Sequence, residues 1–261
     1  MASQRVIVCA DDFAISPGVS EGILKLIANH RLSAVSCMTA SRYWKDQAKA
    51  LKPLSNTVDI GLHLTLTDQI PLLKHARLTP GGRLPNLQRL LAICLTNPSV
   101  ANEVERELNA QLDHFVGSLG KLPDFIDGHQ HVHQFPVIRD VLIKIIVERY
   151  RDENKFPYVR ICEDKISALW SRRRGFMKAL FIGFLSSPLR RLAQQAGIST
   201  NAGFSGIYDF SEKQYASAFE GFLRELPDLG LVMCHPGFAD EALMAVDSLT
   251  FEREIEYEFL A

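Results

Sequence analysis

The sequence predicts an α/β fold with a parallel sheet. Short apolar runs rich in β-branched residues alternate with longer segments of helical periodicity, which is the pattern of parallel α/β architectures. The runs are spread over all 261 residues, and no obvious domain boundary separates them. We therefore expect a single domain over residues 1–261.

Seven segments are strand candidates. In chain order they are Val6–Cys9, Ala34–Met38, Val58–Leu62, Phe125–Asp127, Tyr158–Ile161, a weak run near Phe204–Ile207, and Leu231–Cys234. Between them, Ser16 followed by Pro17 is a typical N-cap and first-turn pair, and it opens a helix toward Asn29. Apolar residues recur at helical spacing in two further segments, Val100–Leu119 and Ser211–Leu226.

Two segments depart from this simple alternation. Residues 65–98 are rich in proline and glycine, and we expect a long loop or insertion of the kind that is often functional. Residues 171–195 hold a mostly apolar stretch between two groups of arginines. We expect an amphipathic helix there, packed on the rest of the domain or on a partner subunit in a homodimer. The alternative is weak contact of residues 171–191 with a membrane surface or a lipid-linked substrate.

The overall composition excludes some classes of function. Lys and Arg number 29 against 30 Asp and Glu, a formal charge of −1, so the charge excess typical of a general nucleic-acid binder is absent. Five widely spaced cysteines without a C-x-x-C pair argue against a disulfide framework. The sequence shows neither a signal-peptide pattern nor an apolar stretch near the roughly 20 residues of a membrane span. We expect a cytoplasmic globular protein.

Unusual polar residues gather where the predicted strands end. Since the carboxyl ends of parallel strands meet on one face of a barrel, we expect these side chains to converge in one site. Taken singly, most have an ordinary explanation as turn, cap or core residues. The five groups are Asp11 and Asp12; His63; Asp127, His129, His131 and His133; Arg160; and His235.

Three alternating histidines after the fourth strand favour a divalent-metal site. An extended chain would place His129, His131 and His133 on one side, whereas a helical turn would bring His129 and His133 together. Two imidazoles and one carboxylate leave positions open for water and substrate, as a catalytic site requires. Of two adjacent aspartates, one can bind the metal while the other takes a proton from the water. The other histidines, His30, His75 and His114, are expected to be structural or solvent-exposed.

Four motifs of the chain resemble those of the YdjC-like carbohydrate deacetylases. They occur in the family's order and at similar spacing: Ala10-Asp11-Asp12-Phe13, Gly61-Leu62-His63-Leu64, Asp127-Gly128-His129-Gln130-His131-Val132-His133, and Cys234-His235-Pro236-Gly237. The resemblance implies a distorted, incomplete (β/α) TIM-like barrel with its site at the C-terminal strand ends. It also implies one divalent ion, Mg²⁺ or Zn²⁺, and removal of acetyl groups from N-acetylated sugars such as chitooligosaccharides.

The resemblance also implies roles for individual residues. Metal ligation falls to Asp12, His63 and His129, proton abstraction to Asp11, and protonation of the leaving group to His235. Arg160 resembles a substrate-site arginine, and the remaining groups, Asp127, His131 and His133, are expected to support the ligands or contact substrate. The family usually has glycine where this chain has Ala14 and asparagine where it has Cys9. Two alternatives remain: a catalytically silent metal- or sugar-binding protein, and a hydrolase of another amide or ester bond.

Overall fold

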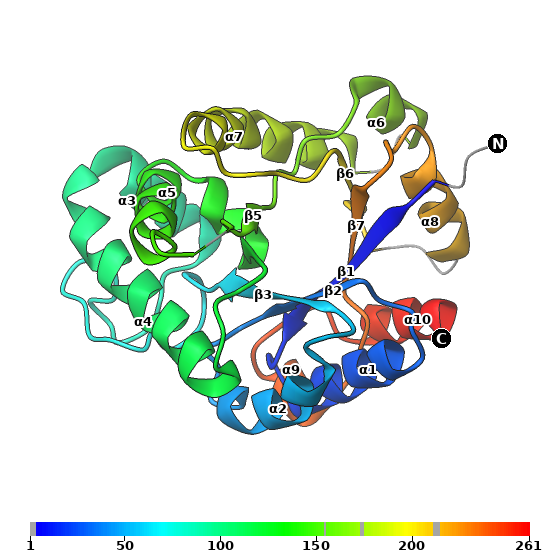
Figure 1. Cartoon of the computed structure of the whole chain (residues 1–261), viewed down its shortest axis with the longest axis horizontal. Coiled ribbons are helices and arrows are strands. Elements are labelled where there is room, and N and C mark those ends of the chain that lie inside the picture. The colour runs from blue at the N-terminus through cyan, green and yellow to red at the C-terminus, as the bar shows by residue number, and fades with distance from the viewer. Residues whose placement is uncertain (1–3, 154, 173–174, 211–214) are drawn as a thin grey trace.

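One parallel seven-stranded sheet forms the centre of the protein (Figure 1). The structure is a computed structural model that describes residues 4–153, 155–172, 175–210 and 215–261. The spatial strand order is β5-β4-β3-β2-β1-β7-β6, and each neighbouring pair is parallel. The strands are β1 (Val6–Phe13), β2 (Ala34–Cys37), β3 (Asp59–Leu64), β4 (Phe125–Gly128), β5 (Tyr158–Val159), β6 (Phe204–Ser205) and β7 (Gly230–Cys234). The α/β class and the seven parallel strands are confirmed.

The sheet curls until its two edge strands nearly meet, but it does not close through a full ladder. Val159 in β5 forms a single parallel bridge with Thr200 in the segment before β6. Beyond it, the Asn201 side chain accepts from the Ile161 N–H (2.7 Å) and donates to the carbonyls of Ile161 (2.9 Å) and Gly203 (2.8 Å). A side-chain amide thus replaces backbone pairing at the seam, which confirms the distorted, incomplete barrel.

Helices surround the sheet (Figure 1). Those in the described residues are α1 (Pro17–Ala28), α2 (Trp44–Leu51), α3 (Leu87–Thr96), α4 (Ala101–Leu119), α5 (Ile138–Arg149), α6 (Ile166–Arg172), α7 (Phe176–Gln195), α8 (Tyr215–Leu223), α9 (Glu241–Met244) and α10 (Phe251–Leu260). Helix α1 begins as expected, because the Ser16 hydroxyl accepts a hydrogen bond from the Val19 N–H and Pro17 occupies the first turn. Among the described residues, no helix is long and apolar enough to cross a membrane.

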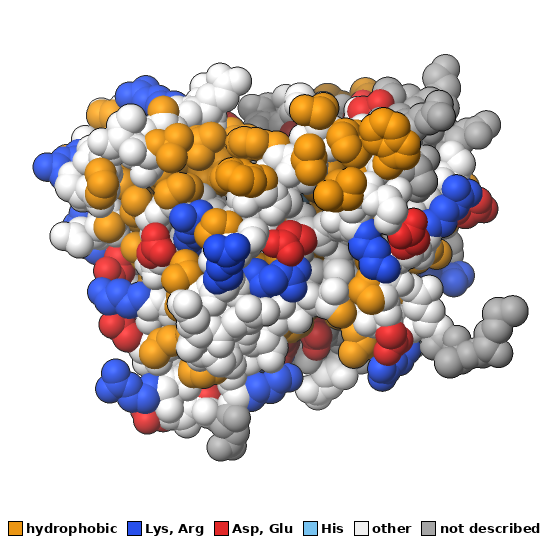
Figure 2. All heavy atoms as spheres, turned by 90° about the horizontal axis from the view of Figure 1, so that it is seen from above, with side chains coloured by type: hydrophobic (Ala, Val, Ile, Leu, Met, Phe, Trp, Pro, Cys, Tyr) orange, Lys and Arg blue, Asp and Glu red, His pale blue; other side chains and the backbone are white. Residues whose placement is uncertain are grey.

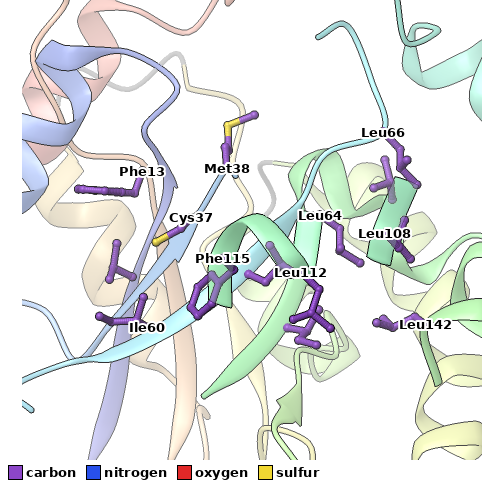
Figure 3. Packing of buried hydrophobic residues seen from close by; sticks show 14 of the residues in the cluster. Phe13, Cys37, Met38, Ile60, Leu64, Leu66, Leu108, Leu112, Phe115 and Leu142 are labelled. Atoms are coloured by element: carbon purple, nitrogen blue, oxygen red, sulfur yellow. The ribbon is translucent and has the colours of Figure 1, made fainter. Parts of the chain in front are cut away.

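The apolar side of α4 packs against the strands beside it (Figure 3). Leu108, Leu112 and Phe115 recur at helical spacing and are almost completely buried. Phe115 also stacks on Trp44 of α2, with 5.9 Å between ring centroids. Full burial of a side chain of this size contributes about 1.5–3 kcal/mol relative to exposure. This packing fixes the outer helices on the sheet and leaves the strand ends free to carry polar groups.

Several expected boundaries were wrong. Strand β1 continues to Phe13 and β3 to Leu64, so Asp11, Asp12 and His63 lie inside strands rather than after them. The pairing of β1 with β2 shifts register between Ala10 and Phe13, and such a bulge re-aims side chains beside it.

The expected loop over residues 65–98 was wrong in its second half, where Asn86 caps α3. The expected helix Ser211–Leu226 is seen as α8, which ends at Leu223, and its first residues, 211–214, lie outside the described residues. The segment 171–195 contains the end of α6 and the whole of α7; Arg173 and Arg174 are outside the described residues.

Candidate active site

A pocket of about 550 Å³ lies at the carboxyl ends of the strands. Six of the polar residues expected at the site line it: Asp11, Asp12, His63, His129, His131 and His235. Asp127, His133 and Arg160 do not line the pocket and are completely buried behind it. The walls from α7 and from the chain after β6 are largely apolar apart from Lys178, whereas Asp247, Ser248, Glu252 and Arg253 form a polar wall.

Asp12, His63 and His129 form the tightest cluster in the pocket. The Asp12 Oδ1 atom lies 2.8 Å from His129 Nδ1 and 3.2 Å from His63 Nε2. One donor atom from each residue lies within 4.8 Å of the other two, which is a spacing that a single ion can bridge. The three residues come from β1, β3 and the turn after β4, so the curl of the sheet brings them together.

The orientation of His63 fits a cation between these donors. Its Nδ1 lies 2.7 Å from Asp127 Oδ1 and 3.0 Å from the hydroxyl of Ser36, so this nitrogen carries the proton that Asp127 accepts. Nε2 then faces Asp12 Oδ1 as a second acceptor, and two acceptors come this close only around a proton or a metal ion. Although burial favours neutral imidazole, Asp127 and Asp11 raise the pKa of His63 to about 10. The residues present therefore fit a divalent ion.

Asp11 is held by a buried arginine rather than by the histidines. Arg160, just after β5, places Nη1 2.6 Å from Asp11 Oδ2 and Nη2 2.6 Å from Asp11 Oδ1. The same Nη2 lies 2.6 Å from Asp127 Oδ2. This bidentate pair fixes both oxygens of Asp11. Through Arg160, Asp11 is also linked to Asp127, which contacts His63. Arg160 thus positions these carboxylates from behind the pocket, where it is completely buried.

The backbone of β1 is strained where it presents the two aspartates. Asp12 has φ 63° and Ala14 has φ 73°, values that residues with a Cβ adopt rarely. The Ser20 hydroxyl accepts a hydrogen bond from the Ala14 N–H (3.0 Å) and helps hold this turn. Glycine adopts such a φ without strain, which explains the family preference at this position. Strain of this kind is typical of functional sites.

The three histidines after β4 point to different places. The chain forms a short 3₁₀ segment, His129–Gln134, in which Gln130 and His131 have φ 52° and 60°. His129 meets Asp12, whereas His131 lies at the pocket wall with its Nδ1 3.4 Å from Cys162 Sγ. His133 Nε2 lies 2.9 Å from the Arg160 carbonyl, to which it donates. Both expected arrangements were therefore wrong, because two left-handed residues break the extended and the helical periodicity.

His235 follows β7, the strand that pairs with β1, and lines the same pocket. Its backbone N–H donates to Glu256 Oε2 (2.6 Å), and Phe210 packs edge-on against its ring at 5.6 Å between centroids. Its Nδ1 is buried and has no hydrogen-bond partner in the described part of the chain. Burial outweighs the attraction of Asp12 and lowers the pKa of His235 to about 4, so its imidazole is neutral near pH 7.

Two residues of the site were missed from the sequence. Arg253 in α10 is completely buried and places Nη2 2.7 Å from Asp12 Oδ2 and 2.7 Å from Asp247 Oδ2. It neutralises the oxygen of Asp12 that faces away from the histidines. Ser36 on β2 contacts both His63 and Asp127. A polar residue inside a buried strand was the available signal for Ser36, whereas nothing in the amphipathic pattern of α10 marked Arg253.

The remaining histidines lie away from this cluster. His75 is buried and its Nε2 lies 2.9 Å from Glu107 Oε2, and Glu107 also accepts the backbone N–H groups of Leu72 and Leu73. The pair ties the segment after β3 to α4. His114 on α4 lies 3.4 Å from the Thr39 carbonyl, and His30 is exposed after α1. All three have the structural or exposed positions expected of them.

Comparison with known proteins gives consistent relatives over nearly the whole chain. A carbohydrate deacetylase of Brevibacillus brevis is 29% identical, and the alignment covers 98% of this chain and 90% of that protein. A chitooligosaccharide deacetylase of Proteus mirabilis is 28% identical over 98% of this chain and 89% of its own. A crystal structure of an Enterococcus faecalis protein named for cellobiose-phosphate cleavage matches with a TM-score of 0.74 at 21% identity, covering 99% and 91% of the two chains.

The family assignment rests on the whole sequence rather than on the motifs alone. The sequence profile of the family described as YdjC-like protein matches residues 5–261. That range includes all seven strands and every residue of the pocket. The chain belongs to the YdjC-like family.

Proposed function

We propose that the protein is a metal-dependent hydrolase that removes the acetyl group from an N-acetylated sugar and releases acetate. The observation that carries this proposal is the division of the two adjacent aspartates. Asp12 meets two imidazoles, whereas Asp11 is held by Arg160 and reaches the same pocket. Water-activating deacetylation needs these two separate carboxylates, one for the ion and one for the proton. The names of the relatives support an acetylated sugar as substrate.

The metal would be held by Asp12, His63 and His129. When bound, a divalent ion polarises the acetamide carbonyl and lowers the pKa of a water molecule. Arg253 and Asp127 would keep these side chains in place. Arg253 contacts the second oxygen of Asp12, and Asp127 contacts the second ring nitrogen of His63. Two imidazoles and one carboxylate suit Zn²⁺ better than Mg²⁺, which prefers oxygen ligands, so Zn²⁺ is the first ion to test.

Asp11 would take the proton from the attacking water. Arg160 holds both of its oxygens, so the carboxylate cannot rotate away from the pocket when substrate enters. His235 would protonate the departing amine. Since burial keeps its imidazole neutral near pH 7, a proton has to reach His235 before the C–N bond breaks. Deacetylation is therefore expected to slow as the pH rises.

Acetate release from an N-acetylglucosamine oligomer by zinc-loaded protein tests the proposal. Asp11→Asn should lower the rate by about 10²–10⁴, the usual contribution of a general base, without lowering the zinc content. Asp113→Asn is a matched control, because Asp113 pairs with Arg149 at the surface, away from the pocket. Unchanged acetate release in Asp11→Asn would disprove its role as base. Zinc-loaded protein that binds sugars without releasing acetate would instead favour a silent binding protein.

A further inference from the structure

Helix α7 is apolar on two opposite sides. Its inner side is buried against the domain through Ala179, Ile182 and Leu189. Its outer side carries a second stripe at positions i, i+3, i+4 and i+7, formed by Met177, Leu180, Phe181 and Phe184. These four side chains are between 39% and 76% exposed. A helix on the surface of a globular protein typically has charged or polar residues on its outer side.

Helix α6 extends the outer stripe. Ile166 and Trp170, one helical turn apart, are 67% and 71% exposed, and the Trp170 ring packs edge-on against Phe176 at 5.8 Å between centroids. Figure 2 looks onto this side of the molecule and shows hydrophobic side chains in a broad band across it. The α6–α7 apolar face is defined here as Ile166, Trp170, Met177, Leu180, Phe181 and Phe184. Contiguous exposed apolar surface of this kind marks an interaction site.

The apolar face continues into the pocket. Phe181 belongs to both, since it lines the pocket and is 52% exposed. Ile182 and Leu185 extend the same wall inward, and Ile207 faces it from the chain after β6. The pocket therefore has a polar end with Asp11 and the proposed metal ligands, and an apolar wall that runs out to the surface along α7. An apolar wall that reaches the surface complements a hydrocarbon group attached to the sugar.

We infer that the substrate is an N-acetylated sugar carried on a hydrocarbon chain at a lipid surface. The acetamide would lie at the polar end, and the chain would leave the pocket over Phe181 while the α6–α7 apolar face rests on the lipid. Exposed aromatic residues next to basic ones are typical of helices that lie in a membrane interface. The acetylated sugar in this inference rests on the proposed function. The contact with lipid is argued independently, from the α6–α7 apolar face.

Charges beside the face favour anionic lipid over a second copy of the chain. Lys165, directly before α6, and Arg191, in the last turns of α7, are exposed. An isologous dimer through this face would bring the same basic patch of both copies together. Anionic headgroups complement these charges.

Co-sedimentation with phosphatidylglycerol–phosphatidylcholine vesicles tests the lipid contact. We expect the protein to bind them and W170D/F184D to bind at least about tenfold more weakly, because two apolar side chains are lost from the contact. I70D/L95D is the matched control, since Ile70 and Leu95 are 65% and 63% exposed but lie in the segment after β3 and on α3. Circular dichroism should show folded protein in each case. Wild-type protein that stays in the supernatant would overturn the inference, as would a dimer that W170D/F184D dissociates.

A second arm separates this inference from the proposed function. Acetate release is measured with an N-acetylglucosaminyl lipid in the same vesicles and with soluble N-acetylglucosamine oligomer. W170D/F184D should lose rate on the vesicle substrate by at least about tenfold and keep the rate on the soluble one. Vesicle binding without acetate from either substrate would contradict the proposed function and leave the lipid contact standing. Equal loss on both substrates would show that the face serves the fold rather than the lipid.

Discussion

Replacing Asp127 by asparagine tests how the proposed metal site is held together. Asp127 is completely buried, and its two oxygens face two donors, His63 Nδ1 at 2.7 Å and Arg160 Nη2 at 2.6 Å. An asparagine has one acceptor oxygen and one amide donor. Whichever way the amide turns, its NH₂ group meets an N–H of His63 or of Arg160. Asp127→Asn therefore loses a charge and also creates a clash of donors.

The expected effect is on metal affinity more than on folding. Residues that orient a metal-binding histidine typically contribute about 10–100-fold to affinity. This corresponds to about 1.4–2.7 kcal/mol of binding free energy. Arg160 keeps its two bonds to Asp11 in the variant, so that buried charge still has a partner. The fold should survive with a lower melting temperature.

Zinc affinity is best measured by competition with a chromophoric chelator at pH 7.5. The wild-type protein, Asp127→Asn and Asp113→Asn are compared, the last being a surface variant that removes the same charge. We expect weaker binding only in Asp127→Asn. A folded Asp127→Asn protein with unchanged zinc affinity would refute the proposed role of His63, because its orientation would then not matter to the ion.

Three further perturbations test other parts of the structure. Arg253→Met should cost about 3–5 kcal/mol of stability in urea denaturation, because Asp12 and Asp247 lose a buried partner; a loss no larger than that from breaking an exposed pair would contradict this. Burial lowers the pKa of His133 to about 4. As the pH falls from 6.5 to 4, the unfolded chain takes up the proton first and the unfolding free energy drops; His133→Gln should flatten that drop, and an unaltered pH profile would argue against it. Asn201→Leu leaves the N–H and the carbonyl of Ile161 without their side-chain partner, and it should lower the unfolding free energy by about 1–3 kcal/mol for each group. An unchanged midpoint in urea denaturation would show that the closure between β5 and β6 does not depend on Asn201.

The order of strands and helices was predictable because each depends on local periodicity. Strand ends were not, since β1 and β3 continue through polar residues that water would normally surround. Asp11, Asp12 and His63 are tolerated inside strands because Arg160, Arg253 and Asp127 neutralise or bind them. These partners come from distant parts of the chain, so no local pattern shows which group each of them would meet.

The meeting of the strand-end groups in one pocket was predictable, but the directions in which the three histidines after β4 point were not. Parallel strands bring their carboxyl ends together, and for this reason Asp12, His63 and His129 could be expected to lie near one another. The separation of His129 from His131 and His133 depends on two left-handed residues, Gln130 and His131. Neither residue is glycine, so the sequence carried no sign of that turn.

Acetate release before and after removal of metal tests whether Asp12, His63 and His129 hold a catalytic ion. The protein is stripped with a chelator, assayed with an N-acetylglucosamine oligomer and with its lipid-borne counterpart, and assayed again after one equivalent of Zn²⁺ or Mg²⁺. We expect no acetate from stripped protein and recovery with one ion per chain, and no recovery in a variant lacking His63 and His129. Full acetate release by verified metal-free protein would contradict the proposed metal dependence.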